Sequence, residues 1–308
     1  MYSNITFKNK SSAHIDVVFS QIVVNSLIIG SIYALVASGF SLIYATNKFM
    51  HFAHGVSIAV SGYVLFTLFT LLNLPFSISC VLTILFTGLF GWSCYRFIYL
   101  PMQGRKASNV VLLIASLGIL ILFQNIIQLL YGANVKSIGF LKIVRGFDIL
   151  GATVTPLQVV IVVLSFVLFA ALYFFMLKTK LGRDMRAVAD NKELASIVGI
   201  DYKKVAGASF FIGSALAGVA GILIGLERNL TPVMGTDLMV KGFTGAVIGG
   251  ITSVPGSILG SLLLGFAENF GMWYLPSGYK DAIAFGLLFV FLLFRPQGIF
   301  GIDKGVKQ

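Results

Sequence analysis

The chain has 308 residues, of which 57% are hydrophobic and only 11% charged, with a mean hydropathy of +0.95. A soluble domain has about 25% charged residues, so this composition excludes an ordinary soluble protein and indicates an integral membrane protein. The net charge of +11 does not indicate nucleic-acid binding. Most lysines and arginines lie between apolar stretches, where the positive-inside bias puts them, and they form no contiguous basic face.

Residues 1–15 are polar and lack a small-residue cleavage site, so the first apolar stretch is predicted to be a retained span rather than a signal peptide. A bilayer-crossing helix needs about 20 apolar residues. The stretches that meet this requirement, in chain order, are 17–37, 56–72, 79–98, 109–130, 157–177, 205–226, 256–273 and 281–294. Residues 242–254 are apolar but only about half as long, which is typical of a short, broken or re-entrant helix. The predicted fold is therefore a single all-α polytopic transmembrane bundle of eight to nine spans.

The basic residues predict the orientation of the spans. They gather in the connector that holds Arg105 and Lys106, in residues 178–204, and at the C-terminus with Arg295, Lys304 and Lys307. All three groups share the cytoplasmic side if 242–254 crosses the membrane, which gives nine traversals with the N-terminus outside. A weaker group opposes this orientation and comprises Lys136, Lys142 and Arg145.

The longest predicted cytoplasmic stretch is 178–204. Good helix formers fill residues 183–197, and Gly199 is a natural helix stop. Apolar residues recur at helical spacing among charged ones, namely Met185, Val188, Leu194, Ile197 and Val198. An amphipathic cytoplasmic helix either lies on the membrane surface or inserts into a groove of a partner, and both uses are open at this point.

This connector resembles a known motif. Glu193, Leu194 and Ala195, followed after three residues by Gly199, are similar to the Glu-Ala-Ala-x-x-x-Gly loop of ATP-binding-cassette (ABC) importer permeases, with Leu194 at the usual second alanine. The longer stretch LGRDMRAVADNKELASIVGI (181–200) resembles the connector of the branched-chain amino acid (Liv-type) permeases. The resemblance implies that this helix docks into the cytoplasmic ATPase. It assigns the coupling role to Arg183, Asp184, Arg186, Ala189, Glu193, Ala195 and Gly199.

Two further stretches resemble the first permease subunit of the same family. Residues 25–55 carry small residues at three- to four-residue spacing, typical of a tight helix seam, and end in Phe52-Ala53-His54-Gly55, similar to the family's Asn-Phe-Ala-His-Gly signature with His51 at the asparagine. Residues 243–270 are similar to its Gly-Gly-x-Gly-Ser-x-Pro-Gly run with Thr252 at a usual glycine, and residues 295–301 are also family-like. The candidate pathway or signature residues are Phe52, His54, Gly55, Gly249, Gly250, Pro255, Gly256 and Glu268.

Charged residues inside an apolar span are costly, at about 2.5–3.5 kcal/mol on insertion scales, and each needs a partner or a function. For Glu268 we expect a structural pairing with Lys280 or Arg228, with a place on the pathway or near the membrane interface as the alternatives. Glu227 and Arg228 are expected to form an interfacial pair, and Asp237 and Lys241 to anchor the ends of the half-span. His54 is expected to be a hydrogen-bonded helix cap, with a role in transport as the alternative.

The sequence argues against an enzyme. It has no Gly-x-x-x-x-Gly-Lys-Ser/Thr phosphate loop, so this chain is expected to bind no cofactor, and ATP and Mg²⁺ are expected to be used by partner subunits. Cys80 and Cys94 share one apolar segment without metal-ligand spacing, so no metal site and no disulfide is expected.

The family resemblance implies an assembly in the bacterial inner membrane. It comprises this chain, a second homologous permease in a heterodimer, two cytoplasmic ATPases and a substrate-binding protein that is periplasmic or tethered. Leucine, isoleucine and valine are the implied cargo, with urea, short amides or other amino acids as alternatives. A stand-alone secondary transporter or channel is the rival function. It usually places coupling carboxylates at mid-membrane, whereas the acidic residues here lie near predicted span ends or in the connector. A membrane-embedded enzyme is a more distant rival.

Overall fold

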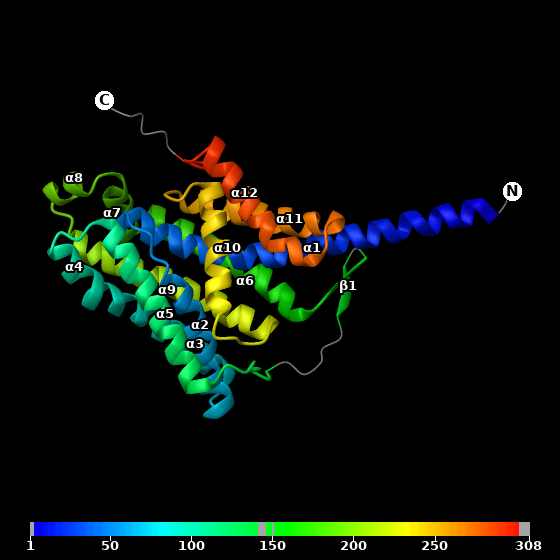
Figure 1. Cartoon of the computed structure of the whole chain (residues 1–308), viewed down its shortest axis with the longest axis horizontal. Coiled ribbons are helices and arrows are strands. Elements are labelled where there is room, and N and C mark those ends of the chain that lie inside the picture. Colours follow the sequence, from blue (N-terminus) through cyan, green and yellow to red (C-terminus); the bar gives the residue numbers. More distant parts are fainter. Residues whose placement is uncertain (1–2, 141–145, 150, 302–308) are drawn as a thin grey trace.

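The computed structural model describes residues 3–140, 146–149 and 151–301, and the side chains within it from residue 17 onward with the exception of residue 277. Lys142, Arg145, Lys304 and Lys307, which entered the orientation argument, lie outside the described residues. The described chain is a helical bundle with one small hairpin (Figure 1).

Six helices are long and apolar enough to cross a membrane. They are α1 (Ser3–Asn47, apolar from Val17), α2 (His54–Leu65) with a π-helical turn (Phe66–Leu71), α3 (Phe76–Cys94) with its extensions, α5 (Asn109–Tyr131), α6 (Pro156–Lys178) and α9 (Tyr202–Glu227). The extensions of α3 are a π-helical turn (Tyr95–Tyr99) and α4 (Leu100–Gly104).

A seventh candidate span is a bent pair, α10 (Met234–Gly249) and α11 (Val254–Tyr274), whose axes differ by 115°. The structure therefore has six to seven candidate spans among the described residues, and the predicted eight to nine are not confirmed. The last helix, α12 (Lys280–Phe294), follows a 3₁₀ turn (Ser277–Tyr279). Its 15 residues extend about 22 Å, short of a hydrocarbon core of about 30 Å.

The predicted break in 242–254 is present, but the predicted boundaries of the half-span were wrong. Helix α10 begins eight residues earlier than expected, and the chain turns at residues 250–253, where Gly250 has φ +112°. Only glycine takes this conformation without strain. The C-terminal segment closes the turn, because the backbone N–H groups of Ile299 and Phe300 donate to the carbonyls of Ile248 and Gly249 at 2.9 and 3.0 Å. These carbonyls end α10 and have no partner within the helix.

The two ends of the bundle differ. The short helices α7 (Lys180–Asp190) and α8 (Lys192–Ile197) lie at one end, which we call the connector end. The N-terminal part of α1 projects from the other, the hairpin end, beside the antiparallel strands β1 (Phe147–Ile149) and β2 (Ala152–Val154) (Figure 1). The hairpin lies in what the sequence indicated only as a loop. Gln21 of α1 holds it through both backbone polar groups of Thr153.

Small residues bring the inner helices together, as the spacing in 25–55 predicted. Helices α1 and α11 run antiparallel, and a Cβ on Gly265 would lie 2.7 Å from the Cα of Gly30. At other crossings a Cβ on Gly213 would lie 2.8 Å from the carbonyl oxygen of Gly39, and one on Gly55 2.9 Å from that of Gly235. Backbones at these distances leave no room for a side chain, so the core of α1, α2, α9, α10 and α11 depends on glycine.

Candidate functional site

The connector forms two helices rather than the single one predicted over 183–197. Asn191 interrupts the helix with φ −148° and ψ +109°. Its side chain accepts hydrogen bonds from the backbone N–H groups of Glu193 and Leu194 at 2.9 and 3.1 Å, which caps α8. Gly199 ends the unit with φ +85°, as its predicted role as a helix stop requires.

Helix α7 packs on the bundle. Met185 and Val188 are 0% and 1% exposed, and Lys48 at the end of α1 donates to the carbonyl of Ala189 at 2.6 Å. Gly182 allows α7 to turn closely against the end of α6, because a Cβ there would overlap the backbone of Phe175 and Met176. Motion of α7 is therefore tied to motion of α1 and α6.

Helix α8 does the opposite. Its Ala195 is buried, but Leu194, Ile197 and Val198 are 60%, 79% and 75% exposed. These three apolar residues, which we call the α8 patch, were predicted to continue the face of Met185 and Val188. The break at Asn191 separates the two sets, so one contacts the bundle and the other is unpartnered within the described structure.

One contact joins α8 to the start of α9, and a cap fixes the start of α9 itself. The ammonium of Lys192 lies 3.4 Å from the ring centroid of Tyr202, and partial burial lowers the pKa of Lys192. Asp201 caps α9 by accepting from the backbone N–H groups of Lys203 and Lys204, and these hydrogen bonds lower the pKa of its carboxyl. The predicted coupling residues thus lie on one unit held at α1, α6 and α9.

The signature residues near residue 52 are packing residues in this structure. His54 is fully buried at the start of α2, and its Nε2 lies 3.2 Å from the carbonyl oxygen of Val36. Phe52 packs its ring on that of Phe243, with centroids 5.5 Å apart. The expectation that His54 caps its helix is wrong, because α2 begins without a side-chain cap and the ring of His54 contacts α1 instead.

The glycine run lies at the turn between α10 and α11. A Cβ on Gly249 would overlap the carbonyl of Gly256, and one on Gly256 that of Gly249, while Pro255 occupies the first turn of α11. This turn faces α7 across an apolar cavity of ≈ 540 Å³, to which Met185, Arg186, Ser253 and Pro255 all contribute. The turn therefore belongs to the connector end.

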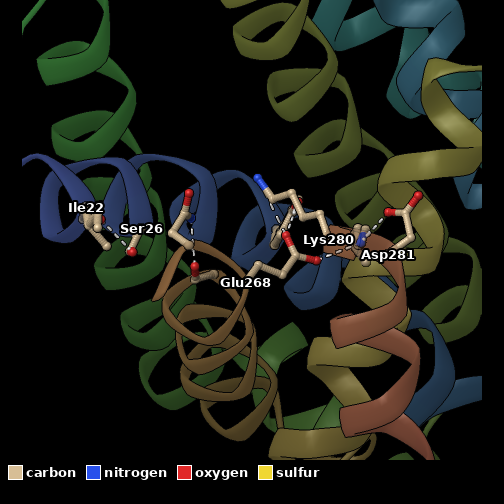
Figure 2. A network of polar contacts seen from close by, with 9 residues as sticks. Ile22, Ser26, Glu268, Lys280 and Asp281 are labelled. Atoms are coloured by element: carbon tan, nitrogen blue, oxygen red, sulfur yellow. Dashed lines mark hydrogen bonds and ion pairs between the residues drawn. The ribbon is translucent and has the colours of Figure 1, made fainter. Parts of the chain in front are cut away.

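Glu268 lies elsewhere, in a group of charged and polar side chains that we call the ion cluster, in which Glu268 and Lys241 are buried and Asp281 is exposed. It comprises Tyr33, Lys241, Glu268, Lys280 and Asp281. Figure 2 shows Glu268 of α11 reaching toward Lys280 and Asp281 at the start of α12. The structure thus divides the predicted pathway residues between the connector end and the ion cluster.

Lys241 is the centre of the ion cluster. Its Nζ lies 2.7 Å from Oε1 of Glu268 and 2.7 Å from Oδ1 of Asp281. The other carboxylate oxygen of Glu268 accepts from the Tyr33 hydroxyl at 2.9 Å and lies 3.8 Å from Nζ of Lys280. The buried carboxylate is thus held by two cations and a phenol, as a charge removed from water requires.

Three sequence-based assignments change here. The pairing of Glu268 with Lys280 is confirmed, but its nearest partner is Lys241, which does not anchor the end of a half-span. Lys241 is 7% exposed, in the middle of α10. One signal in the sequence indicates the central position of Lys241: it is a lysine within the apolar stretch that begins at Met234. Glu227 accepts from the Gln158 side chain at 2.8 Å, and the expected pair with Arg228 is absent from the ion pairs of the described residues.

No group of three or more histidine, cysteine, aspartate or glutamate side chains in the described part of the chain is placed to hold a metal ion. The geometry provides a helical unit for contact with a partner and, away from it, the ion cluster around the buried pair of Lys241 and Glu268.

Known proteins resemble this chain along nearly its whole length. A family model described as "Branched-chain amino acid transport system / permease component" matches residues 22–292. The branched-chain amino acid permease BraD of Pseudomonas aeruginosa is 36% identical, over 92% of this chain and 96% of its own length. LivH of Escherichia coli (strain K12), a high-affinity branched-chain amino acid transport system permease, is 34% identical with the same coverage of both chains.

One solved structure, PsaBC from Streptococcus pneumoniae in complex with Fab, matches with a TM-score of 0.50 and 15% identity. The match covers 90% of this chain and 92% of that chain. At this identity the likeness concerns the fold alone.

Proposed function

This chain belongs to the family of branched-chain amino acid transport permeases, membrane-spanning subunits of ABC importers, and we propose that its α7–α8 unit couples the ATPase subunits to the transport pathway. ATP hydrolysis in such an importer lies in separate subunits. This chain is a multi-pass inner-membrane protein, and it forms the translocation pathway for branched-chain amino acids.

The observation that carries the coupling proposal is the opposite burial of α7 and α8. The α8 patch presents Leu194, Ile197 and Val198 at 60–79% exposure, while α7 packs against α1 and α6. An apolar helix face without an intramolecular partner fits a groove on another protein. Because α7 is fixed to α1 and α6, and α8 to α7 and α9, a force on α8 reaches the bundle through α7 and α9.

The rival role for α8 is to lie on the lipid surface. A surface helix needs no defined partner, so substitutions in the α8 patch would then weaken membrane contact but leave ATPase binding intact. The break at Asn191 and the cap on α8 favour the docking role, because a helix that only lies on lipid has no need of an aligned, capped second segment.

We further propose the finer arrangement. The α7–α8 unit and the C-terminus face the cytoplasm and the hairpin end faces outward. Helices α10, α11 and α12 each run between the two ends, which makes nine traversals. The lysines and arginines of the connector support this orientation. A second, related permease is the proposed dimer partner, and a binding protein delivers cargo at the hairpin end. No nucleotide is proposed to bind this chain.

The coupling proposal is tested by the double variant Ile197→Glu/Val198→Glu in the assembled importer. We expect loss of ATPase co-purification and of leucine uptake, because two carboxylates would enter an apolar contact. Val135→Glu is the matched control: Val135 is 58% exposed and lies in the loop that pairs with Leu230 near the hairpin end. Normal co-purification and uptake in the α8 double variant would refute the coupling role.

A further inference from the structure

A polar cavity of ≈ 460 Å³ lies toward the hairpin end, between α1, α9, α10 and α12. Its volume falls within the range of about 300–1,000 Å³ typical of small-molecule sites. The ion cluster adjoins it, since Tyr33, Lys241, Lys280 and Asp281 contribute to its wall. None of the sequence motifs accounts for this cavity.

The charged groups of the wall fall into two sets. Arg228, Lys241 and Lys280 are the three cations, and Asp237 and Asp281 are the two anions. Three of the five are already engaged in the ion cluster: Lys241 pairs with Asp281 and Glu268, and Lys280 lies near Glu268. Arg228 and Asp237 remain exposed, and neither takes part in an ion pair of the described residues. The cavity thus offers one cation and one anion that no ion pair of the described residues occupies.

Apolar side chains complete the wall. Ile29, Ile224 and Leu238 are buried there, and Phe285 contributes from α12. A cavity with an available cation, an available anion and an aliphatic wall is complementary to a zwitterion that carries a hydrocarbon side chain. A lone anion or a lone cation would leave one of the two available charges without a partner.

We propose that this cavity, the outer cavity, binds the zwitterionic amino acid. Arg228, with Lys280, receives the α-carboxylate, Asp237 receives the α-ammonium, and the aliphatic wall holds the branched side chain. Lys241 is a positioning residue: by holding Asp281 and Glu268 it fixes the floor of the cavity. This inference rests on the proposed function, because that function supplies the cargo.

The first test is uptake of radiolabelled L-leucine into proteoliposomes that contain the complete importer. Arg228→Gln and Asp237→Asn remove one charge each at nearly constant size. We expect each to lower uptake at subsaturating leucine by about tenfold, the effect of losing one charge-assisted hydrogen bond. Lys136→Gln is the matched control, because Lys136 pairs through its backbone with Leu230 but does not line the cavity.

The outcomes separate the two proposals. If the unaltered importer does not take up leucine, the proposed cargo is wrong. If the unaltered importer takes up leucine and both cavity variants take it up equally well, the outer cavity is not the binding site, although the importer function stands. The affinity of the binding protein for the vesicles is measured in parallel, and a loss of uptake that only follows weaker docking would also overturn the site.

A second readout does not depend on the binding protein. The purified permease–ATPase complex is heated with millimolar L-leucine, with isoamylamine, which lacks the carboxylate, or with 4-methylpentanoate, which lacks the ammonium. We expect L-leucine to raise the melting temperature, each analogue to raise it less, and Arg228→Gln to remove the leucine effect. Equal shifts with all three compounds, or no shift with leucine, would contradict a zwitterion site.

Discussion

The inner helices of this bundle bury most of their residues, whereas the outer helices bury few of theirs. In the most apolar stretch of α1, 94% of residues are buried, against 22% in α6 and 28% in α5, although α5 and α6 have the higher hydropathy. In a soluble protein the most apolar helix is normally the most buried. Here the solvent for the outer helices is lipid, so the outer surface must be apolar, whereas the interior can hold glycine, hydroxyl and charged side chains that find partners there.

The ion cluster shows most clearly that the interior of this bundle can hold charged side chains. Of the substitutions considered, Glu268→Leu should lower the stability of the protein most. Lys241 would then remain buried with a single carboxylate partner, and removing one member of a buried pair costs about 3–5 kcal/mol. We expect a lower melting temperature in detergent and a lower yield. The double variant Lys241→Met/Glu268→Leu removes both charges and should recover part of the loss. A Glu268→Leu variant with unchanged melting temperature would show that the cluster does not stabilise the interior.

A charged side chain on the outer surface should be unfavourable by a similar free energy. Val167 lies mid-way along α6 and is 57% exposed. Val167→Lys should raise the insertion free energy of α6 by about 3 kcal/mol, because lysine at the centre of a span is unfavourable by that amount. The measurement is the inserted fraction in a translocon insertion assay, with Val167→Ile as the control. Unimpaired insertion would mean that this face of α6 meets protein or water rather than lipid.

Replacing a glycine by alanine should destabilise the protein between the inner helices but not on the outer helices. Gly265→Ala would place a methyl group 2.7 Å from the Cα of Gly30, so we expect a loss of about 1–3 kcal/mol of stability from overpacking. On Gly118 of α5, by contrast, an added Cβ would have no neighbouring atom within 4 Å. Gly118→Ala should therefore be neutral or stabilise by up to about 1 kcal/mol, through the better helix propensity of alanine. Equal melting temperatures for the two variants would remove the distinction between the two sets of helices.

The connector is neither an inner nor an outer membrane helix, yet α8 exposes apolar residues although it is not part of a lipid-facing span. Asn191→Ala removes the cap of α8 and should cost about 1 kcal/mol of local helix stability. Faster hydrogen exchange at the amides of Glu193 and Leu194 would report it, with the amides of α7 unchanged as the internal control. Exchange that accelerates equally in both helices would mean that α7 and α8 unfold as one unit.

Much of this arrangement follows from the sequence. The membrane location follows from composition, because a chain with 11% charged residues cannot present a water-compatible surface. The connector and the turn near residue 250 could be located because charge, helix formers and glycine act locally, within a few residues of one another. The family resemblance rests on the same local stretches.

Other features required the tertiary structure. The nearest partner of Glu268 is Lys241, 27 positions earlier in the chain, and the Tyr33 hydroxyl that donates to Glu268 is 235 positions away. Both α1 and α6 are apolar enough to cross a membrane, so the search for spans in the sequence did not show that α1 is inside and α6 outside. The break at Asn191 was also missed, because helix propensity is summed over neighbours and one side-chain cap can overrule it. The sequence by itself determined that this is a membrane protein with a charged connector, since solvent preference and chain stiffness are local properties. Only the tertiary structure decided which apolar faces meet protein and which charges meet each other, since those pairings depend on how distant segments pack.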